Sequence, residues 1–256
     1  MYKIERQEKI LDYVNREERA SVTELSELFQ VSKVTIRTDI DELEMKGLVN
    51  KTHGGVVSKE VGIFSEIPYE IKNQSKVKEK QKIAAEAVKY IKKNDVIILD
   101  SGSTTFHLIQ GLPEEITVIT TDILMAMEMI KCRKDIQIIM PGGEVEKSVY
   151  TLKGIDTIRF FESLHADKVF LGCDALDLDF GISDRSREYA AVKKAMIEAS
   201  SEIVLLTDSS KFNSKLGTKV CPMQKVDILV VDEIEENMKQ KCESLGINVV
   251  VASKRD

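Results

Sequence analysis

Most of the chain repeats one pattern, in which short apolar-rich runs alternate with longer segments of helical periodicity. Seven such runs are Val96–Leu99, Thr117–Thr120, Ile136–Met140, Lys168–Leu171, Ile203–Leu206, Ile228–Val231 and Val249–Val251. Short runs with few polar interruptions are typical of strands that are buried on both faces. Their alternation with helices predicts an α/β domain over residues 83–256, built around a largely parallel sheet.

Residues 3–58 have a different pattern, in which helical periodicity is followed by two short strands. The apolar positions of the first two helices are Ile4, Ile10, Leu11 and Val14, and then Leu25, Leu28 and Phe29. Ser21 and Glu24 have the spacing of a capping box, which predicts the start of the second helix. Residues 48–57 predict two strands around a turn at His53, Gly54 and Gly55.

A third helix is marked at both of its ends. Ser32 is a preferred residue for capping a helix start, and Gly47 suits the left-handed residue that ends one. Ile36, Ile40 and Leu43 recur at helical spacing and predict a buried face. The opposite face carries Lys33, Val34, Arg37, Thr38 and Asp41. This order of elements, with a turn at Gln30 and Val31, predicts a winged helix-turn-helix whose third helix enters a groove of operator DNA.

The charge balance does not by itself indicate a nucleic-acid-binding protein. The formal net charge is −6, and residues 1–57 contain nine Lys or Arg against eleven Asp or Glu. A winged helix needs only a local positive face, however, and four acidic residues are expected to face away from it: Glu17, Glu18, Glu42 and Glu44. We expect the DNA-binding residues to be Ser32, Lys33, Val34, Thr35, Arg37, Thr38, Lys51 and His53.

The spacing of these residues resembles the DeoR-type repressor domain over residues 3–58. The resemblance rests on Leu25, Phe29, Val31, Ser32, Thr35, Ile36, Arg37 and Asp39, followed by Gly47, Leu48 and the His53-Gly54-Gly55 turn. The family usually has a second Arg where this chain has Thr38, and a more basic wing than Asn50 and Lys51. The resemblance implies a DNA-binding regulator of transcription.

Residues 59–82 are predicted as a linker. Gly62, Pro68 and Asn73 interrupt the periodicity before a regular helix begins at Ile83. The linker is rich in lysine, at Lys72, Lys76, Lys78, Lys80 and Lys82. Such runs of charge usually form a solvated helix face, so we expect no binding site there.

Polar residues follow the predicted strands at the edge where ligands bind in open α/β sheets. The first such segment contains Asp100, Ser101, Gly102, Ser103, Thr104 and Thr105, at what is expected to be a helix N-terminus. Backbone N–H groups and hydroxyls there suit a phosphate, although a capped turn without a ligand is an equally good explanation of this segment alone. Later strand ends add Thr120, Thr121, Gly143, Asp174 and Lys211, and the ammonium of Lys211 suits a phosphate.

These strand ends resemble the DeoR-type C-terminal sensor domain, as do Glu188 and the segment 192–197 that follows it. The resemblance implies the ribose-5-phosphate isomerase/CoA-transferase-like fold and a phosphorylated sugar as effector. The expected effector-binding residues are Asp100, Ser101, Gly102, Ser103, Thr104, Thr105, Thr120, Thr121, Gly143, Asp174, Glu188 and Lys211. The segment 170–181 is most similar to the amino-sugar and hexitol branch of the family.

Two other functions remain open at this point. A sugar-phosphate isomerase would use Asp100, Asp174 or Glu188 as a general base and Lys211 to hold the phosphate. The Lys-Gly-Gly-Gly segment of those isomerases is not found in the chain, however, and a DNA-binding unit precedes the domain. A platform for oligomerisation alone would not explain the polar strand ends. We therefore expect a repressor rather than an enzyme, with no cofactor.

Composition and isolated residues add four further expectations. A hydrophobic fraction of 43% and a charged fraction of 31% are ordinary for a globular protein, and no membrane span or apolar signal region is present, which predicts a cytoplasmic protein. The four cysteines are expected to be reduced thiols, and the three scattered histidines do not predict a zinc site. Met125, Met127 and Met129 are expected to fill the core or a subunit interface. Paired operator half-sites favour a homo-oligomer, either a dimer or a tetramer.

Overall fold

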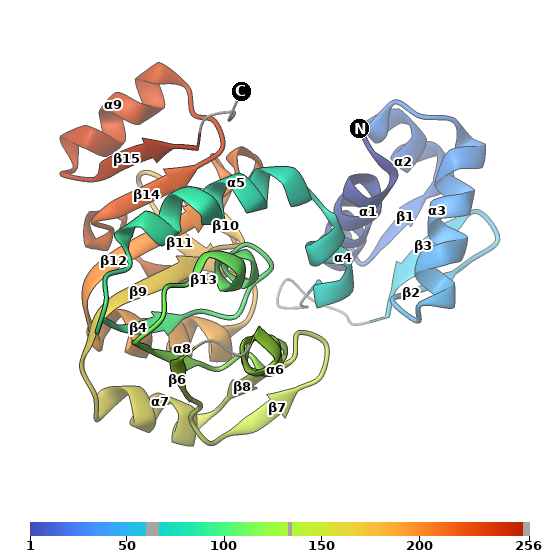
Figure 1. The fold of residues 1–256 in the computed structure, drawn as a ribbon. Coiled ribbons are helices and arrows are strands. Elements are labelled where there is room, and N and C mark those ends of the chain that lie inside the picture. The colour runs from blue at the N-terminus through green and yellow to red at the C-terminus, as the bar shows by residue number, and fades with distance from the viewer. Residues whose placement is uncertain (60–66, 133–134, 253–256) are drawn as a thin grey trace. The chain divides into compact units, whose positions relative to one another are not determined.

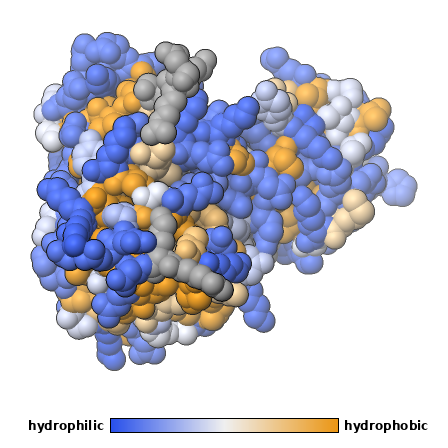
Figure 2. Space-filling model, viewed as in Figure 1, coloured by the Kyte–Doolittle hydropathy of each residue, from blue (hydrophilic) through white to orange (hydrophobic). Residues whose placement is uncertain are grey.

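The computed structural model describes residues 1–59, 67–132 and 135–252 (Figure 1). The chain forms two compact units, Met1–Lys76 and Val77–Asp256. Figure 2 shows polar side chains over much of the face in view, with apolar patches between them.

The first unit is a winged helix-turn-helix, as the sequence predicts. Its elements are α1 (Lys3–Glu17), β1 (Arg19–Ser21), α2 (Val22–Phe29), α3 (Lys33–Met45), β2 (Val49–Lys51), β3 (Gly55–Ser58) and α4 (Tyr69–Gln74). The capping box of Ser21 and Glu24 forms at the start of α2. The wing is a three-stranded sheet in the order β1-β3-β2. Strand β1 was not expected from the sequence, because a three-residue strand has little pattern of its own and exists through its pairing with β3.

The core of this unit lies mainly between helices α1, α2 and α3 and the wing. Its side chains are at most 2% exposed at Ile10, Leu11, Val14, Leu25, Ile36, Ile40 and Leu43. The helical pattern predicts that Leu28 points inward with Leu25 and Phe29, but this prediction is wrong, because the Leu28 side chain is 51% exposed. Three-residue steps fall short of a helical turn, so by Leu28 the chain has rotated away from the face of Val22 and Leu25.

The segment 67–76, predicted as part of the linker, is instead packed structure. Ile67 and Ile71 are 3% and 2% exposed and join the core of the first unit. Helix α5 (Val77–Ala87) begins six residues before the predicted Ile83. Lys80 is buried rather than solvated, because it shares a helical face with Ile83 and the alanines of α5. Gly62 lies outside the described residues.

The second unit follows the predicted alternation of strands and helices. Its first elements are α5, η1 (Val88–Tyr90), β4 (Val96–Leu99), η2 (Thr105–Gly111), β5 (Ile116–Thr120), α6 (Ile123–Cys132), β6 (Ile136–Ile139), β7 (Glu144–Glu146), β8 (Thr151–Lys153) and α7 (Ile155–Glu162). The later elements are β9 (Ala166–Gly172), β10 (Ala175–Asp177), β11 (Gly181–Asp184), α8 (Arg187–Glu198), β12 (Ser200–Thr207), η3 (Ser209–Lys211), β13 (Thr218–Cys221), η4 (Met223–Lys225), β14 (Ile228–Val231), α9 (Glu236–Ser244) and β15 (Asn248–Val251).

The seven predicted apolar runs form one seven-stranded sheet in the order β15-β14-β12-β9-β4-β5-β6. Every pairing in this sheet is parallel. Successive side chains of a strand point to opposite faces of the sheet and so enter two separate cores, as those of Ile97 and Ile98 in β4 do. Helices α5 and α6 with η2 cover one face, and α7, α8 and α9 cover the other (Figure 1). The α/β architecture predicted from the sequence is confirmed.

The strand order reverses between β4 and β9. From β4 the chain continues through β5 to β6 on one side, and from β9 through β12 and β14 to β15 on the other. In an open parallel sheet, this reversal leaves a crevice beyond the carboxyl ends of the two strands, and ligands bind there. The segment after β4 differs from the prediction, because the expected α-helix is the short 3₁₀ helix η2.

A small antiparallel sheet in the order β10-β11-β13 stands beside this edge. Gly181 begins β11 with φ +105°, and an added Cβ would lie 2.1 Å from the carbonyl oxygen of Cys221. The close approach of these strands therefore requires glycine at this position.

Candidate functional site

Helix α3 presents the predicted DNA-binding face. The Oγ of Ser32 accepts from the backbone N–H of Thr35 at 3.1 Å and lies 2.9 Å from the Thr35 hydroxyl. Both residues therefore hold the start of the helix in place. Lys33 and Arg37 are exposed, and within residues 1–59, 67–132 and 135–252 neither side chain forms an ion pair. These two cations are available for phosphates or base edges.

The wing is less positive than the sequence suggests. The ammonium of Lys51 pairs with Asp41, and the Lys51 backbone N–H donates to Glu44 Oε1 at 2.8 Å. Glu44 was expected to face away from the positive face that includes Lys51, but it contacts the Lys51 backbone, because the turn after α3 brings β2 beside it. His53 is exposed between β2 and β3, where the sequence places it.

A buried ion pair missed by the sequence reasoning supports α3 from behind. Arg6 of α1 donates to Asp39 through Nε at 2.5 Å and through a second guanidinium nitrogen at 3.3 Å. The two side chains are 9% and 1% exposed. This paired geometry fixes the orientation of α3 on α1 and so the direction of its exposed face.

Three charged side chains meet beyond the carboxyl ends of β4 and β9. Lys193 of α8 lies 2.6 Å from Asp184 Oδ2 and 3.2 Å from Asp100 Oδ2, and it donates to the Gly172 carbonyl at 2.9 Å. Asp100 also accepts from the backbone N–H of Gly172 at 3.0 Å. Lys193 therefore ties the ends of β4, β9 and β11 to α8.

Burial and charge act in opposite directions in this cluster. Burial raises the pKa of Asp100 to about 6, although the charge of Lys193 opposes that shift. Burial lowers the pKa of Lys193, but the charges of Asp100 and Asp184 outweigh it and hold this pKa well above its ordinary value. Lys193 therefore stays charged, as a fixed cation between two carboxylates.

Sequence reasoning missed Lys193 and Asp184. Lys193 carried a usable signal, because it falls on the buried face of α8, three residues after Ala190 and four before Ile197. A lysine at such a position needs a buried anionic partner.

The loop after β4 contains both partly exposed and buried residues. Ser101 and Gly102 are half-buried, and the Ser101 hydroxyl donates to Asp122 Oδ2 at 3.2 Å. Ser103 and Thr104 are buried. Thr105 is fully buried and donates its hydroxyl to the carbonyls of Asp100 and Gly102 at 2.7 and 2.9 Å, which is a structural role.

The hydroxyls after β5 are also used within the protein. Thr120 accepts from the backbone N–H of Asp122 at 3.1 Å, and the hydroxyls of Thr121 and Thr151 lie 2.9 Å apart. Asp122 accepts from the Met125 N–H at 2.9 Å, and burial raises its pKa to about 6. This arrangement positions a carboxylate of raised pKa next to Ser101.

The remaining predicted effector residues lie in several elements around this edge. The N–H of Asp174 donates to Asp184 Oδ1 at 3.1 Å, which links it to the Lys193 cluster, and its carboxylate lies 3.9 Å from Arg185 Nε. Glu188 lies in the first turn of α8 and pairs with Lys153 of β8 at 2.5 Å. Lys211 ends η3 after β12 and is half-buried. Gly143 lies between β6 and β7, where an added Cβ would meet Thr157 Oγ1 at 2.2 Å, so this glycine has a packing role.

Comparison with protein families decides the identity of the chain. A model described as the DeoR C terminal sensor domain matches residues 75–233, and one described as the DeoR-like helix-turn-helix domain matches residues 6–61. The chain belongs to the DeoR family of transcriptional regulators. The family predicted from both halves of the sequence is confirmed.

Two similar regulators align with most of this DeoR-family chain. The uncharacterized HTH-type transcriptional regulator YulB of Bacillus subtilis (strain 168) is 37% identical over 89% of this chain and 88% of its own. The HTH-type transcriptional regulator GolR of Listeria innocua is 31% identical over 98% of this chain and 100% of its own. These relatives agree with the prediction of a regulator rather than an enzyme.

Among solved structures, ribose 5-phosphate isomerase A from Methanocaldococcus jannaschii aligns with a TM-score of 0.41 at 23% identity. The alignment covers 57% of this chain and 58% of that chain.

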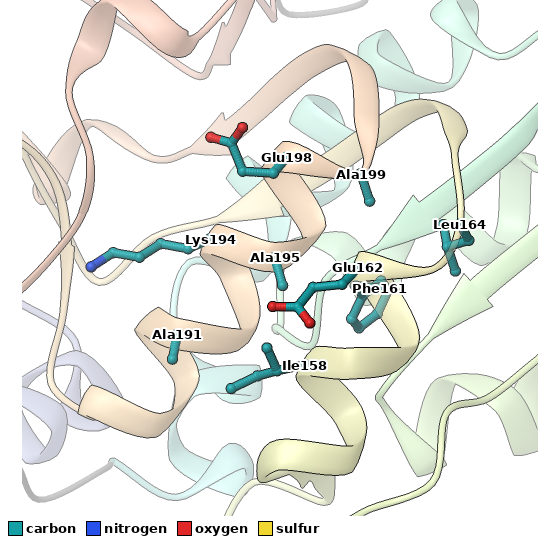
Figure 3. A pocket seen from close by; sticks show the side chains of 9 residues that line it. All are labelled: Ile158, Phe161, Glu162, Leu164, Ala191, Lys194, Ala195, Glu198 and Ala199. Carbon is teal, nitrogen blue, oxygen red and sulfur yellow. The ribbon is translucent and has the colours of Figure 1, made fainter.

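The sensor domain of this DeoR-family regulator also has a groove of about 400 Å³ between α7 and α8 (Figure 3). Apolar side chains of both helices line it, and Glu162, Lys194 and Glu198 stand around it. It contains no predicted effector residue. Lys193 of α8 contacts Asp100, whereas Lys194 lines the groove, so the groove and the Lys193–Asp100 contact lie on different sides of α8.

The described part of the chain contains neither a metal-binding cluster nor a membrane-spanning helix. Its histidines, cysteines and acidic residues include no group of three that could hold a metal ion. None of its helices is long and apolar enough to cross a membrane.

Proposed function

We propose that this DeoR-family protein is a cytoplasmic repressor that a phosphorylated sugar releases from its operator. The sugar binds in the crevice between β4 and β9, and two winged helices of a homo-oligomer occupy paired half-sites. The observation that supports the effector site most directly is the reversal of strand order at β4 and β9, with Asp100 and Ser101 at that point.

The charges of the crevice suit a ligand with both hydroxyls and an anion. Four carboxylates lie near the ends of these strands, at Asp100, Asp122, Asp174 and Asp184, together with the two cations Lys193 and Arg185. Carboxylates accept hydrogen bonds from sugar hydroxyls, but their excess repels a phosphate. A phosphate therefore needs backbone donors and a further cation, which the loop at Ser101 and Gly102 and the ammonium of Lys211 supply.

The names of two relatives support a regulator of carbohydrate operons. One is the L-fucose operon activator of Haemophilus influenzae, at 28% identity, and another is the transcriptional repressor GlcR of Bacillus subtilis, at 29% identity. Because activators and repressors both occur among the relatives, the sign of regulation is part of the experiment.

The test combines a ligand screen with a binding assay on the full chain. A thermal-melt panel of phosphorylated and unphosphorylated sugars identifies the effector, since a ligand at about 100 times its Kd adds about 2.7 kcal/mol. Operator DNA is then titrated with and without that sugar. We expect stabilisation only by phosphorylated sugars, and release of the DNA by the same compound. Stabilisation by free sugars alone, or tighter DNA binding with the effector, would overturn the proposal.

A further inference from the structure

The exposed face of α3 carries an apolar side chain where the helix begins. Val34 is 68% exposed, whereas the other apolar residues of this part of α3, Ile36 and Ile40, are 0% and 1% exposed. An exposed valine adds nothing to the core, and its β-branch is slightly unfavourable in a helix. Its place in the first turn, between the exposed cations of Lys33 and Arg37, gives it a direct approach to DNA.

Thr38 lies one helical turn after Val34, and its hydroxyl proton is already engaged in a hydrogen bond within the helix. Its hydroxyl donates to the Val34 carbonyl at 3.1 Å. A threonine held in this way keeps an acceptor oxygen and a methyl group, but it has no proton to give to a base. Val34 and Thr38 are i and i+4 neighbours, so their methyl groups form one patch on the exposed face.

The major groove of B-DNA offers one apolar group to such a patch. Guanine, cytosine and adenine edges present only hydrogen-bond donors and acceptors there, whereas thymine adds its C5-methyl. A methyl patch flanked by cations therefore matches a thymine that lies beside phosphates or a guanine.

We propose that Val34 and Thr38 recognise thymine C5-methyl groups in the operator half-site. The inference rests on the proposed binding of α3 to DNA and adds the chemical group that these two side chains contact. Arg37 and Lys33 position the patch by contacting phosphates or guanine on either side of it.

The test removes single methyl groups from the DNA. A binding sequence is first selected from a randomised duplex pool with the full chain. Each thymine in it is then replaced by deoxyuridine, which deletes the C5-methyl and leaves the Watson–Crick pair unchanged. We expect one or two positions at which this change weakens binding by roughly threefold to tenfold, as the loss of one or two buried methyl contacts predicts.

Protein variants assign those positions to side chains. Val34→Ala weakens binding to the thymine operator and makes one position insensitive to deoxyuridine. Thr38→Ser keeps the hydroxyl and loses the methyl, so we expect it to abolish sensitivity at the neighbouring position, whereas Thr38→Val keeps a methyl and retains that sensitivity. Met45→Ala is the matched control, because Met45 is 79% exposed at the other end of α3. Thermal melts establish that each variant is folded.

The outcomes separate this inference from the proposed function. Binding that is indifferent to deoxyuridine at every position overturns the methyl contact and leaves the repressor proposal standing. Sensitivity that persists in both Val34→Ala and Thr38→Ser assigns the methyl contact to other residues and also overturns it. If the pool yields no bound sequence, DNA binding by this chain fails, and the inference fails with it.

Discussion

At the scale of single residues, two buried charges matter more than the many exposed ones. Arg6 and Asp39 form a nearly water-free ion pair with two hydrogen bonds, while Lys3 and Glu42 form a similar contact at the surface. Removing one member of a buried pair leaves an uncompensated charge, whereas a surface pair contributes little because water screens it.

The first prediction follows from this contrast. We expect Arg6→Ala to lower the free energy of unfolding of the N-terminal unit by about 3–5 kcal/mol. Lys3→Ala, which breaks the surface pair, is expected to cost less than about 1 kcal/mol. Urea denaturation of the full chain, followed by circular dichroism, measures both changes. Equal effects of the two substitutions would show that the Arg6–Asp39 pair does not hold α3 in place.

A second residue-scale prediction concerns pH. Burial raises the pKa of Asp122 from 3.8 to about 6, so its contribution to stability is fully present below pH 3.8 and is lost as the pH rises through 6. Asp122→Asn keeps an oxygen for the Met125 N–H and removes the charge. We therefore expect this variant to be more stable than the wild type by about 1–3 kcal/mol at pH 8, with no gain at pH 3.

Asp177→Asn is the control for the sign of that effect. The backbone N–H of Phe180 donates to the Asp177 carboxylate and lowers its pKa, so the charged form is the stabilising one. Thermal melts from pH 3 to pH 8 are expected to show a loss of stability at high pH for Asp177→Asn. A gain for both variants, or for neither, would contradict the assignment for Asp122.

At the scale of elements, α3 depends on its two ends. The Ser32 side chain caps the first turn, and Gly47, with φ +72°, follows the last turn as its N–H donates to the Glu44 carbonyl at 2.7 Å. These local contacts leave the middle of the helix free to bury one face and expose the other. The exposed cations near the start are therefore held in a fixed direction.

The third prediction tests this face through Arg37. We expect Arg37→Ala to remain folded and to weaken operator binding by roughly 1–3 kcal/mol. If Arg37 contacts a guanine edge, the base preference relaxes at one position, and if it contacts a phosphate, binding weakens evenly across sequences. Lys46→Ala removes the same charge at the other end of α3 and serves as the control. Unchanged footprints with folded Arg37→Ala protein would remove α3 from the interface.

At the scale of the whole molecule, the chain forms two units, and the proposed function assigns the operator to one and the effector to the other. An effector changes DNA binding only if it has unequal affinity for two states of the protein, and the coupling is reciprocal. A substitution in the effector site is therefore expected to alter release without altering DNA affinity in the absence of effector.

The fourth prediction applies this reasoning to Lys211. In the proposed effector site, Lys211→Ala would remove a charge-assisted contact to the phosphate, and such a contact typically contributes about 1.5–3 kcal/mol. We expect operator affinity without effector to stay near that of the wild type, while the sugar-phosphate concentration needed for release rises about tenfold or more. Lys225→Ala is the control, since Lys225 is an exposed lysine of the same unit that pairs with Glu198. Coincident release curves in gel-shift titrations of wild type and Lys211→Ala would exclude Lys211 from the effector site.

Local and strongly periodic features were predictable from the sequence. The seven strands could be placed because strands buried on both faces need uninterrupted apolar runs, and the bounds of α3 could be placed because caps act within a few residues. Asp100 and Ser101 could be placed at the edge of the sheet because they directly follow a buried apolar run, and the residue after a strand lies at its carboxyl end.

Features that join distant segments were decided only by the tertiary structure. Lys193 pairs with Asp100, which lies 93 residues earlier, and with Asp184 on another strand. No local sequence pattern predicts contacts between residues so far apart. The ion pair of Lys51 with Asp41 also depends on the fold of the wing. The hydrogen bond of the Thr105 hydroxyl to the Asp100 carbonyl likewise could not be predicted from the sequence. Sequence determines which segments are buried, because burial depends on composition and period. The sequence pattern does not predict which buried charges pair, because pairing depends on which distant segments the fold brings together.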